Sequence, residues 1–305
     1  MRQDDDDWDI TESVGLTALG VAAGRAVETR REDGLVDDPY AEAFVEAAGV
    51  EGMMPSAGDA GGDGDGGGGG DDGLWSEHTE YLGVRSLFFD RFFDDAAAQG
   101  VTQAVILAAG LDTRAFRLAW PAGSTVYELD QSRVLAFKDE VLAEKGAEEA
   151  TGRRTVEIDL REDWPAALRA AGFDPDAPTA WLAEGLLPYL PASAEELLFS
   201  RIQELSAPGS AIAVEHFGGS IASMMEDPQM REASRRFGVD VSELIYDEPR
   251  RDPADWLREH GWEVDSAPAS ARAEAFGRPL PDDVATTLGT SRLVSGRRVT
   301  PPPAP

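Results

Sequence analysis

The sequence contains no cysteine in 305 residues, which excludes disulfide bonds and metal sites built on thiolates. No run of 18 uncharged apolar residues occurs, so no membrane-spanning helix is expected. The first eight residues have neither the basic region nor the apolar stretch of a secretory signal. We therefore expect a soluble, cytoplasmic protein without a bound metal.

Basic side chains are scarce as well. Lysine and arginine number 27 against 58 aspartates and glutamates, and the formal net charge is −31. Such a surface repels phosphate backbones and anionic lipid headgroups, so neither nucleic acid nor a membrane is expected as a partner. The excess of acid is the kind that keeps a protein soluble, including in a salty cytoplasm.

The stretch 105–130 has the pattern of a strand, a tight turn, a short helix and a second strand ending in acid. Residues 105–107 are continuously apolar, as in a strand buried on both faces of a parallel sheet. Ala108, Ala109 and Gly110 then allow a sharp turn and close approach of a ligand. Twenty residues beyond Gly110 comes Asp130, on the same side of its strand as Glu128. This spacing suits an adenosine-containing cofactor, although tight packing of a strand on a helix is an alternative explanation for the small residues.

Apolar strand patterns alternate with helical patterns along most of the chain. Alternation of this kind predicts an α/β fold with a doubly wound, mostly parallel, Rossmann-like sheet. Strands are expected at 105–107, 125–130, 155–160, 179–185, 210–216, 262–266 and 290–299. Helices are expected at 17–31, 39–48, 74–98, 133–145, 164–171, 195–205 and 252–261.

Three regions follow from this pattern. Residues 1–100 form a helical lid region, which contains a Gly/Asp-rich loop at 58–73 that is expected to be disordered because it has no apolar residue to bury. A calcium-binding repeat is disfavoured there, since its recurring large apolar position is missing. Residues 101–299 form the α/β core, with an insertion at about 218–251, and 300–305 form a tail.

The first predicted helix ends in three arginines, Arg25, Arg30 and Arg31. Positive charge at this end of a helix favours the helix dipole. The alternative is that one of them binds a substrate carboxylate from the lid.

Three successive strands end in a carboxylate, at Asp130, Asp159 and Glu184. In an open α/β sheet the ligand lies beyond the carboxyl ends of the strands, so these acids should converge. Such a crevice repels a phosphate-rich ligand, and no Gly-x-x-x-x-Gly-Lys loop is present. Hydroxyls, an exocyclic amine and positive charge suit it better, as in adenosine attached to a sulfonium amino acid.

Four motifs resemble those of S-adenosylmethionine-dependent methyltransferases of the leucine carboxyl methyltransferase-like family, particularly its actinobacterial branch. These are LAAGLDTRAFRL at 107–118, YELDQ at 127–131, DLREDW at 159–164 and AEGLLPYL at 183–190. The resemblance extends to 17–44 and to the final strands. It implies a class I methyltransferase sheet whose last strand is antiparallel, and S-adenosyl-L-methionine as the cofactor.

By this resemblance, five residues hold the adenosine half of the cofactor. Gly110 is the turn glycine, and Ala108 replaces a glycine that many members carry. Asp130 binds the ribose, Asp159 meets the adenine amine, and Leu160 packs on the adenine ring.

The resemblance assigns the methionine half to Arg85, for the carboxylate, and Glu184, for the amine. Asp112 and Arg114 lie in the outer half of the 105–130 stretch. Whether they face the cofactor or pair with each other is open at this point.

Methyl transfer from a sulfonium is an in-line displacement, so catalysis rests mainly on orientation. A carboxylate acceptor is already ionised and needs no base, whereas a phenol or alcohol needs one. His216, Tyr189 and His78 are the candidates for that base, and a structural role is the more common one for such residues. We expect O-methylation of a carboxylate or hydroxyl on a small-molecule acceptor. An NAD(P)-dependent oxidoreductase and a catalytically inactive cofactor-binding protein are the alternatives.

Overall fold

The computed structural model describes residues 14–50, 72–217, 244–288 and 291–299. Residues 58–71 of the Gly/Asp-rich loop, residues 218–243 of the insertion and the tail at 300–305 lie outside the described residues. Among the residues that are described, no helix combines the length and apolar character needed to cross a lipid bilayer.

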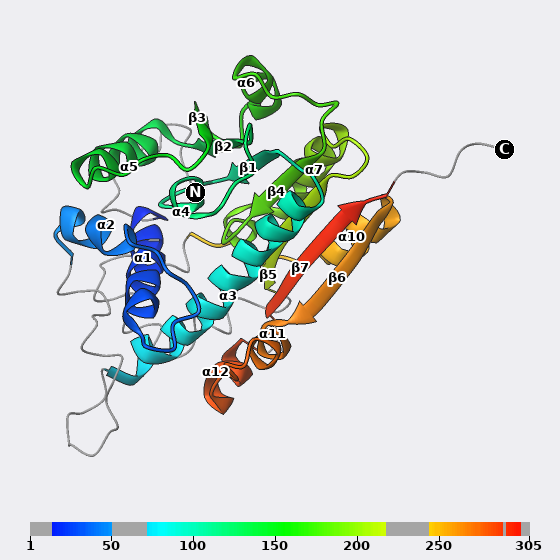
Figure 1. Cartoon of the computed structure of the whole chain (residues 1–305). Helices are drawn as coiled ribbons and strands as arrows, with labels where there is room; N and C mark the ends of the chain where they lie inside the picture. Colours follow the sequence, from blue (N-terminus) through cyan, green and yellow to red (C-terminus); the bar gives the residue numbers. More distant parts are fainter. Residues whose placement is uncertain (1–13, 51–71, 218–243, 289–290, 300–305) are drawn as a thin grey trace.

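Seven strands form one sheet in the order β3-β2-β1-β4-β5-β7-β6 (Figure 1). The strands are β1 (Gln103–Leu107), β2 (Thr125–Asp130), β3 (Gly152–Glu157), β4 (Thr179–Ala183), β5 (Ala211–Phe217), β6 (Trp262–Pro268) and β7 (Ser291–Arg298). The first five strands pair in parallel, and β7 runs antiparallel between β5 and β6. The predicted doubly wound α/β sheet with an antiparallel last strand is therefore confirmed.

Side chains of the central strands alternate between two apolar layers. Ala104 and Ile106 of β1 pack with the aromatic side chains of the long helix α3 (Asp72–Ala98) and with α4 (Arg114–Arg117). Val105 and Leu107 face the other layer, formed with α6 (Trp164–Ala170), α7 (Ala192–Glu204) and α10 (Pro253–Glu259). All five residues of β1 are buried, because both faces of the sheet are covered.

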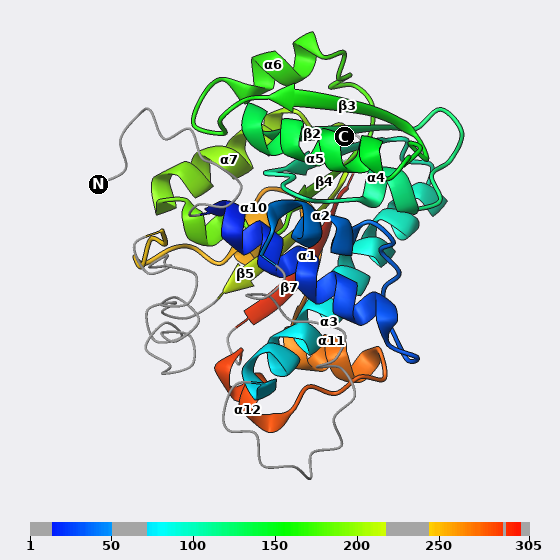
Figure 2. The same ribbon diagram turned by 90° about the vertical axis from the view of Figure 1, so that its left-hand side faces the viewer.

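Helices α1 (Val14–Arg30) and α2 (Ala41–Ala48) lie together beside the sheet (Figures 1 and 2). Helix α2 and helix α5 (Ser132–Glu144) share an apolar cluster with α1. Two glycines allow α1 to cross α3 closely. A side chain at Gly24 would collide with Leu82 of α3, and one at Gly83 would lie 2.7 Å from the Glu28 carboxyl carbon. This crossing fixes where α1 stands relative to the sheet.

Several element boundaries differ from the sequence-based predictions by one to three residues, and those of β3 and α2 are examples. Strand β3 covers Gly152–Glu157 rather than 155–160, because Gly152 pairs with Thr125 at the start of β2. Asp159 therefore lies in the turn beyond the strand. Helix α2 begins at Ala41 rather than at Pro39. The Ala41 amide donates to the Asp38 carbonyl, three residues back, so residues 39–40 form a turn before the helix.

The helices α11 (Ala269–Ala275) and α12 (Asp282–Thr287) were not predicted. Both are shorter than two full turns, so no apolar period could stand out in the sequence. They pack against the first half of α3 through Ala269, Ala273 and Val284. That contact, rather than the local pattern, accounts for their formation.

Candidate functional site

The turn after β1 is unusually tight. Ala108 has a φ of 51° and Gly110 a φ of 48°. A positive φ costs glycine nothing but strains a residue with a side chain, which explains why glycine suits position 108. A side chain at Gly110 would lie 3.7 Å from the Ala18 methyl of α1. Helix α1 therefore stands over this turn, at the carboxyl edge of the sheet.

Asp130 is anchored against that turn. Its Oδ2 accepts a hydrogen bond from the Gly110 amide at 2.6 Å, and its Oδ1 accepts one from the Gln131 amide at 2.7 Å. Burial raises the pKa of Asp130 in spite of these two backbone donors. Each oxygen retains a second lone pair, so the carboxylate is held in place and can still accept hydroxyl groups.

Glu128 has a different surrounding, although it points to the same side of β2. Its Oε2 lies 2.8 Å from the Lys138 Nζ of α5 and 2.8 Å from the Arg153 Nη2 of β3. Both the Glu128 and Lys138 side chains are fully buried. Glu128 therefore joins β2 to its neighbours, and Asp130 alone of the two acids meets the Gly110 turn.

Asp159 and Leu160 lie just after β3, next to the end of β2. The amide of Ile158 donates to the Asp130 carbonyl at 2.9 Å, which places the two acidic strand ends side by side. The Asp159 carboxylate accepts from the Arg161 amide at 2.8 Å and pairs with the Arg161 guanidinium at 2.7 Å. Leu160 packs on the apolar layer beneath it.

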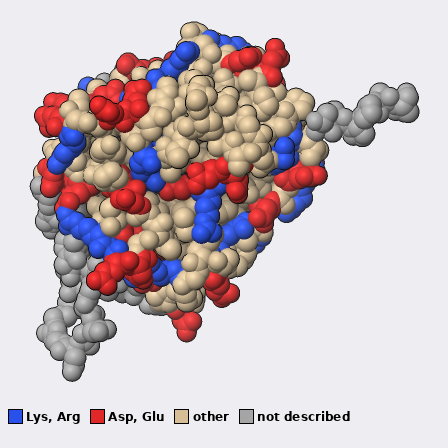
Figure 3. Space-filling view, viewed as in Figure 1, with Lys and Arg blue, Asp and Glu red and all other residues tan. Residues whose placement is uncertain are grey.

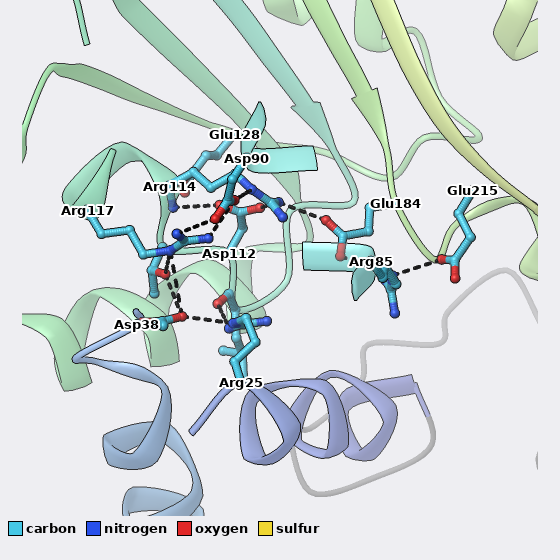
Figure 4. Close-up of polar contacts among 12 residues, drawn as sticks. Arg25, Asp38, Arg85, Asp90, Asp112, Arg114, Arg117, Glu128, Glu184 and Glu215 are labelled. Atoms are coloured by element: carbon cyan, nitrogen blue, oxygen red, sulfur yellow. Dashed lines mark hydrogen bonds and ion pairs between the residues drawn. The ribbon is translucent and has the colours of Figure 1, made fainter. Parts of the chain in front are cut away.

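Glu184 follows β4 and binds two arginines from different elements (Figure 4). Arg85 of α3 places its Nε 3.1 Å from Glu184 Oε1, and Arg114 of α4 places its Nη1 2.7 Å from Oε2. Burial acts to lower the pKa of Arg85, but Glu215 and Glu184 outweigh it and the pKa is raised. Arg85 and Glu184 are thus brought together, as the family resemblance implies.

The contacts of Arg114 show how Asp112 and Arg114 are used, which the sequence left open. Asp112 accepts a hydrogen bond from the Arg114 amide at 2.7 Å and also pairs with its side chain. The same guanidinium reaches Asp90 at 2.7 Å in addition to Glu184. Arg114 and Asp112 therefore pair with each other and, through Glu184, also support the site.

The two arginines of α1, Arg25 and Arg30, and Arg31 just after it all pair with carboxylates of the chain. Arg25 binds Asp38 at 2.8 Å and the carbonyl of Leu111 at 2.7 Å. Arg30 pairs with Glu42, and Arg31 with Asp33. Arg25 thus ties the helix to the loop after β1 and is not presented to a ligand.

The candidate bases are not gathered at the Arg85–Glu184 pair. His216 lies on β5 opposite Arg292, with Asp252 and Arg250 as charged neighbours, and burial lowers its pKa. The Tyr189 hydroxyl points to the Thr17 hydroxyl of α1 at 3.4 Å. The side chain of His78 lies outside the described residues. Within the described ranges no cluster of three or more histidines and acids could hold a metal ion.

Two buried residues of this network were not singled out by the sequence analysis. Asp90 interrupts the aromatic run of α3, and Glu215 lies near the end of β5 after four apolar residues. Glu215 follows the same strand-end pattern as Asp130 and Glu184, and that signal could have identified it.

The strand order with one antiparallel strand, together with acids converging at the carboxyl edge, defines the class I methyltransferases. A family model described as leucine carboxyl methyltransferase matches residues 18–203. A Mycobacteroides abscessus protein named as a putative S-adenosyl-L-methionine-dependent methyltransferase is 50% identical, over 96% of this chain and 95% of its own. A Rhodococcus jostii protein with a similar name is 51% identical, over 92% and 94%.

The chain therefore belongs to the leucine carboxyl methyltransferase family, and S-adenosylmethionine is its cofactor. Among solved structures, a DUF574 family protein from Streptomyces avermitilis is similar in fold. It is 13% identical, has a TM-score of 0.50, and the match covers 91% of this chain and 96% of that one. Family membership removes the oxidoreductase alternative.

The residues present fit this cofactor. Asp130 is fixed beside the Gly110 amide, as a ribose-binding acid requires. Close by in the chain, the carboxamide oxygen Oε1 of Gln131 is buried without a hydrogen-bond partner among the described residues, so a donor from a ligand would satisfy it. Arg85 and Glu184 offer opposite charges for an amino acid group.

Proposed function

We propose that the protein methylates an oxygen atom of a small-molecule acceptor, and that this atom belongs to a carboxylate rather than to a hydroxyl. The observation that carries this preference is the position of the histidines. Two histidine side chains lie within the described residues. His216 lies near the charges of Asp252, Arg250 and Arg292, and the ring of His260 stacks on Trp256 of α10 with the centroids 3.6 Å apart. A carboxylate acceptor, ionised near neutral pH, needs neither of them.

We assign the cofactor contacts as follows. Asp130 accepts the ribose hydroxyls, Asp159 accepts the adenine amine, and Leu160 packs on the ring. Ala108 and Gly110 allow the close approach of the backbone at the turn.

Arg85 and Glu184 would bind the carboxylate and the amine of the methionine. The bound cofactor supplies a methyl group on a positively charged sulfur. The protein has to hold this methyl group in line with the acceptor oxygen and exclude water. Orientation of this kind contributes about 7–11 kcal/mol in well-aligned reactions.

The product distinguishes the two acceptors. We would incubate the protein with methyl-labelled S-adenosylmethionine and panels of small carboxylic acids and phenols, then treat the products with mild alkali. A methyl ester releases volatile labelled methanol, whereas a methyl ether keeps its label. We expect alkali-labile label, and a rate that stays level from pH 6 to 9 because no base titrates.

Asp130→Ala serves as the control, because it should lose cofactor binding and activity together. Alkali-stable label, or a rate that rises with pH, would contradict the proposed carboxylate acceptor. Binding of S-adenosylhomocysteine without transfer to any acceptor would instead support the inactive cofactor-binding protein.

A further inference from the structure

Glu215, near the end of β5, is a buried carboxylate that the cofactor assignments above do not use. Its residue is 1% exposed, and the neighbouring Tyr81 of α3 is 4% exposed. Burial raises the pKa of Glu215, and burial together with Glu215 raises that of Tyr81. A carboxylate that is removed from water in this way requires several partners.

Each oxygen of Glu215 has a defined partner. The Tyr81 hydroxyl donates to Oε1, and the Gly185 amide donates to Oε2 at 2.9 Å. Arg85 Nε lies 3.1 Å from the same Oε2. Glu215 therefore joins α3 to the turn that follows β4 (Figure 4).

Arg85 lies between two carboxylates at this point. Its Nε is 3.1 Å from Glu184 and 3.1 Å from Glu215, and it forms an aligned hydrogen bond with neither. The guanidinium is therefore held mainly by charge. Both of these contacts end on Nε, while Nη2 lies against the backbone of Gly185, 2.9 Å from where a side chain would start.

We propose that Glu215, supported by Tyr81, is a positioning residue that holds Arg85 and the Gly185 turn together, so that the terminal nitrogens of Arg85 meet the methionine carboxylate of the cofactor. This inference rests on the proposed role of Arg85. Nε faces both Glu184 and Glu215, which leaves the terminal end of the planar guanidinium for a ligand. The Gly185 contact sets the position of the adjacent Glu184 at the same time.

Two ligands separate positioning from general stability. S-adenosylhomocysteine carries the amino acid group, and 5′-methylthioadenosine keeps the adenosine and sulfur but lacks it. By titration calorimetry we expect Glu215→Gln to lower the affinity for S-adenosylhomocysteine about tenfold and to leave the affinity for 5′-methylthioadenosine unchanged. A tenfold loss is the effect of one displaced charge-assisted hydrogen bond between Arg85 and the ligand carboxylate. Tyr81→Phe keeps the Glu215 contacts with Arg85 and Gly185, so a smaller loss of about threefold with the same selectivity is expected.

Glu28→Gln provides a matched control. Glu28 is another fully buried glutamate, with one backbone donor, the Leu35 amide at 2.7 Å, and two arginines, Arg278 at 3.3 Å and Arg31 at 4.0 Å. Its substitution should lower the melting temperature without separating the two ligands.

Equal weakening of both ligands by Glu215→Gln and by Tyr81→Phe would overturn the proposal, because it would indicate a general structural role. Tighter binding of S-adenosylhomocysteine by Glu215→Gln would also overturn it, since Glu215 would then only oppose the bound carboxylate. Failure of the proposed role of Arg85 would be visible separately, as wild-type protein that binds 5′-methylthioadenosine no more weakly than S-adenosylhomocysteine, and failure of the proposed acceptor would be visible as alkali-stable label. If Glu215→Gln does not fold, Tyr81→Phe decides by the same selectivity.

Discussion

Gly185 shows how a single residue can determine the shape of a binding site. It follows Glu184 directly and has a φ of 64°, a conformation that residues with side chains rarely adopt. Its amide binds Glu215, and its missing side chain leaves room for the Arg85 guanidinium. Position 185 therefore combines a backbone requirement with a packing requirement.

Gly185→Ala is expected to lower the free energy of unfolding by about 1–2 kcal/mol, the cost of a left-handed residue with a side chain. It should also lower the affinity for S-adenosylhomocysteine, because the new methyl group would lie 2.9 Å from Arg85 Nη2 and displace the guanidinium. Urea unfolding and calorimetry measure the two effects.

Gly49→Ala separates the two requirements. Gly49 caps α2 with a φ of 66°, and nothing lies within 4 Å of where its side chain would start. Its substitution should reduce stability by a similar amount and leave ligand binding unchanged. Wild-type affinity in Gly185→Ala would show that Arg85 is not constrained by this turn.

Among the elements, the short helix η3 (Leu187–Tyr189) connects the site to α7. Arg250, at the end of the segment that follows β5, donates to the carbonyls of Leu187 at 2.7 Å and Leu190 at 3.2 Å. The same guanidinium pairs with Glu195 of α7 at 2.8 Å. One arginine therefore holds η3, α7 and its own segment together.

Burial raises the pKa of Glu195 from 4.5 to about 7, in spite of Arg250, and Glu248 adds to the rise. The folded protein therefore holds the proton more tightly than the unfolded chain between these two pH values. By thermodynamic linkage, this contribution to the free energy of unfolding is complete below pH 4.5 and is lost as the pH rises through 7.

Glu195→Gln should remove that pH dependence. The stability of the wild type relative to Glu195→Gln is expected to fall by about 2 kcal/mol between pH 5 and 8, measured by urea unfolding. Glu196→Gln removes the same charge from the exposed neighbour and should leave the slope unchanged. A difference between wild type and Glu195→Gln that does not vary with pH would exclude this role of Glu195.

Elements with a clear apolar period, apolar run or cap were predicted correctly, whereas the bounds of β3 and the short helices α11 and α12 were not. The strands β1 and β4 and the aromatic helix α3 carry their pattern in the local sequence. The start of β3 depends on which residue of β2 its first residue pairs with, and α11 depends on packing against α3. Both are long-range contacts that no local window contains.

On the scale of the whole molecule, the net charge of −31 is the dominant property. Acidic side chains gather at several places on the face shown in Figure 3, with basic side chains between them. Repulsion among exposed charges destabilises the compact state. The buried ion pairs of the site contribute less to any salt effect, because buried pairs are screened much less.

Salt should therefore stabilise the protein. We expect the Tm to rise by several degrees between 10 mM and about 0.2 M NaCl, as the screening length falls below about 10 Å, and to change little above that range. Sodium sulfate at equal ionic strength distinguishes screening from exclusion of salt from the protein surface. Stabilisation by exclusion keeps increasing with salt concentration, whereas stabilisation by screening levels off. A Tm that is level up to 0.2 M would contradict repulsion as a limit on stability.

The sequence by itself determined the α/β class, the turn at 108–110 and the family, because apolar period, small residues and strand-end acids are local patterns. It also placed Asp130 beside Gly110, since parallel strands bring such residues to one edge of a sheet. Only the tertiary structure decided what each charged residue contacts. Arg25 and Glu128 are used within the protein, whereas Glu215 joins the site through Arg85 and Gly185. The partner of a buried charge is set by helix crossings and strand pairing between distant parts of the chain, and spacing along the sequence does not encode it.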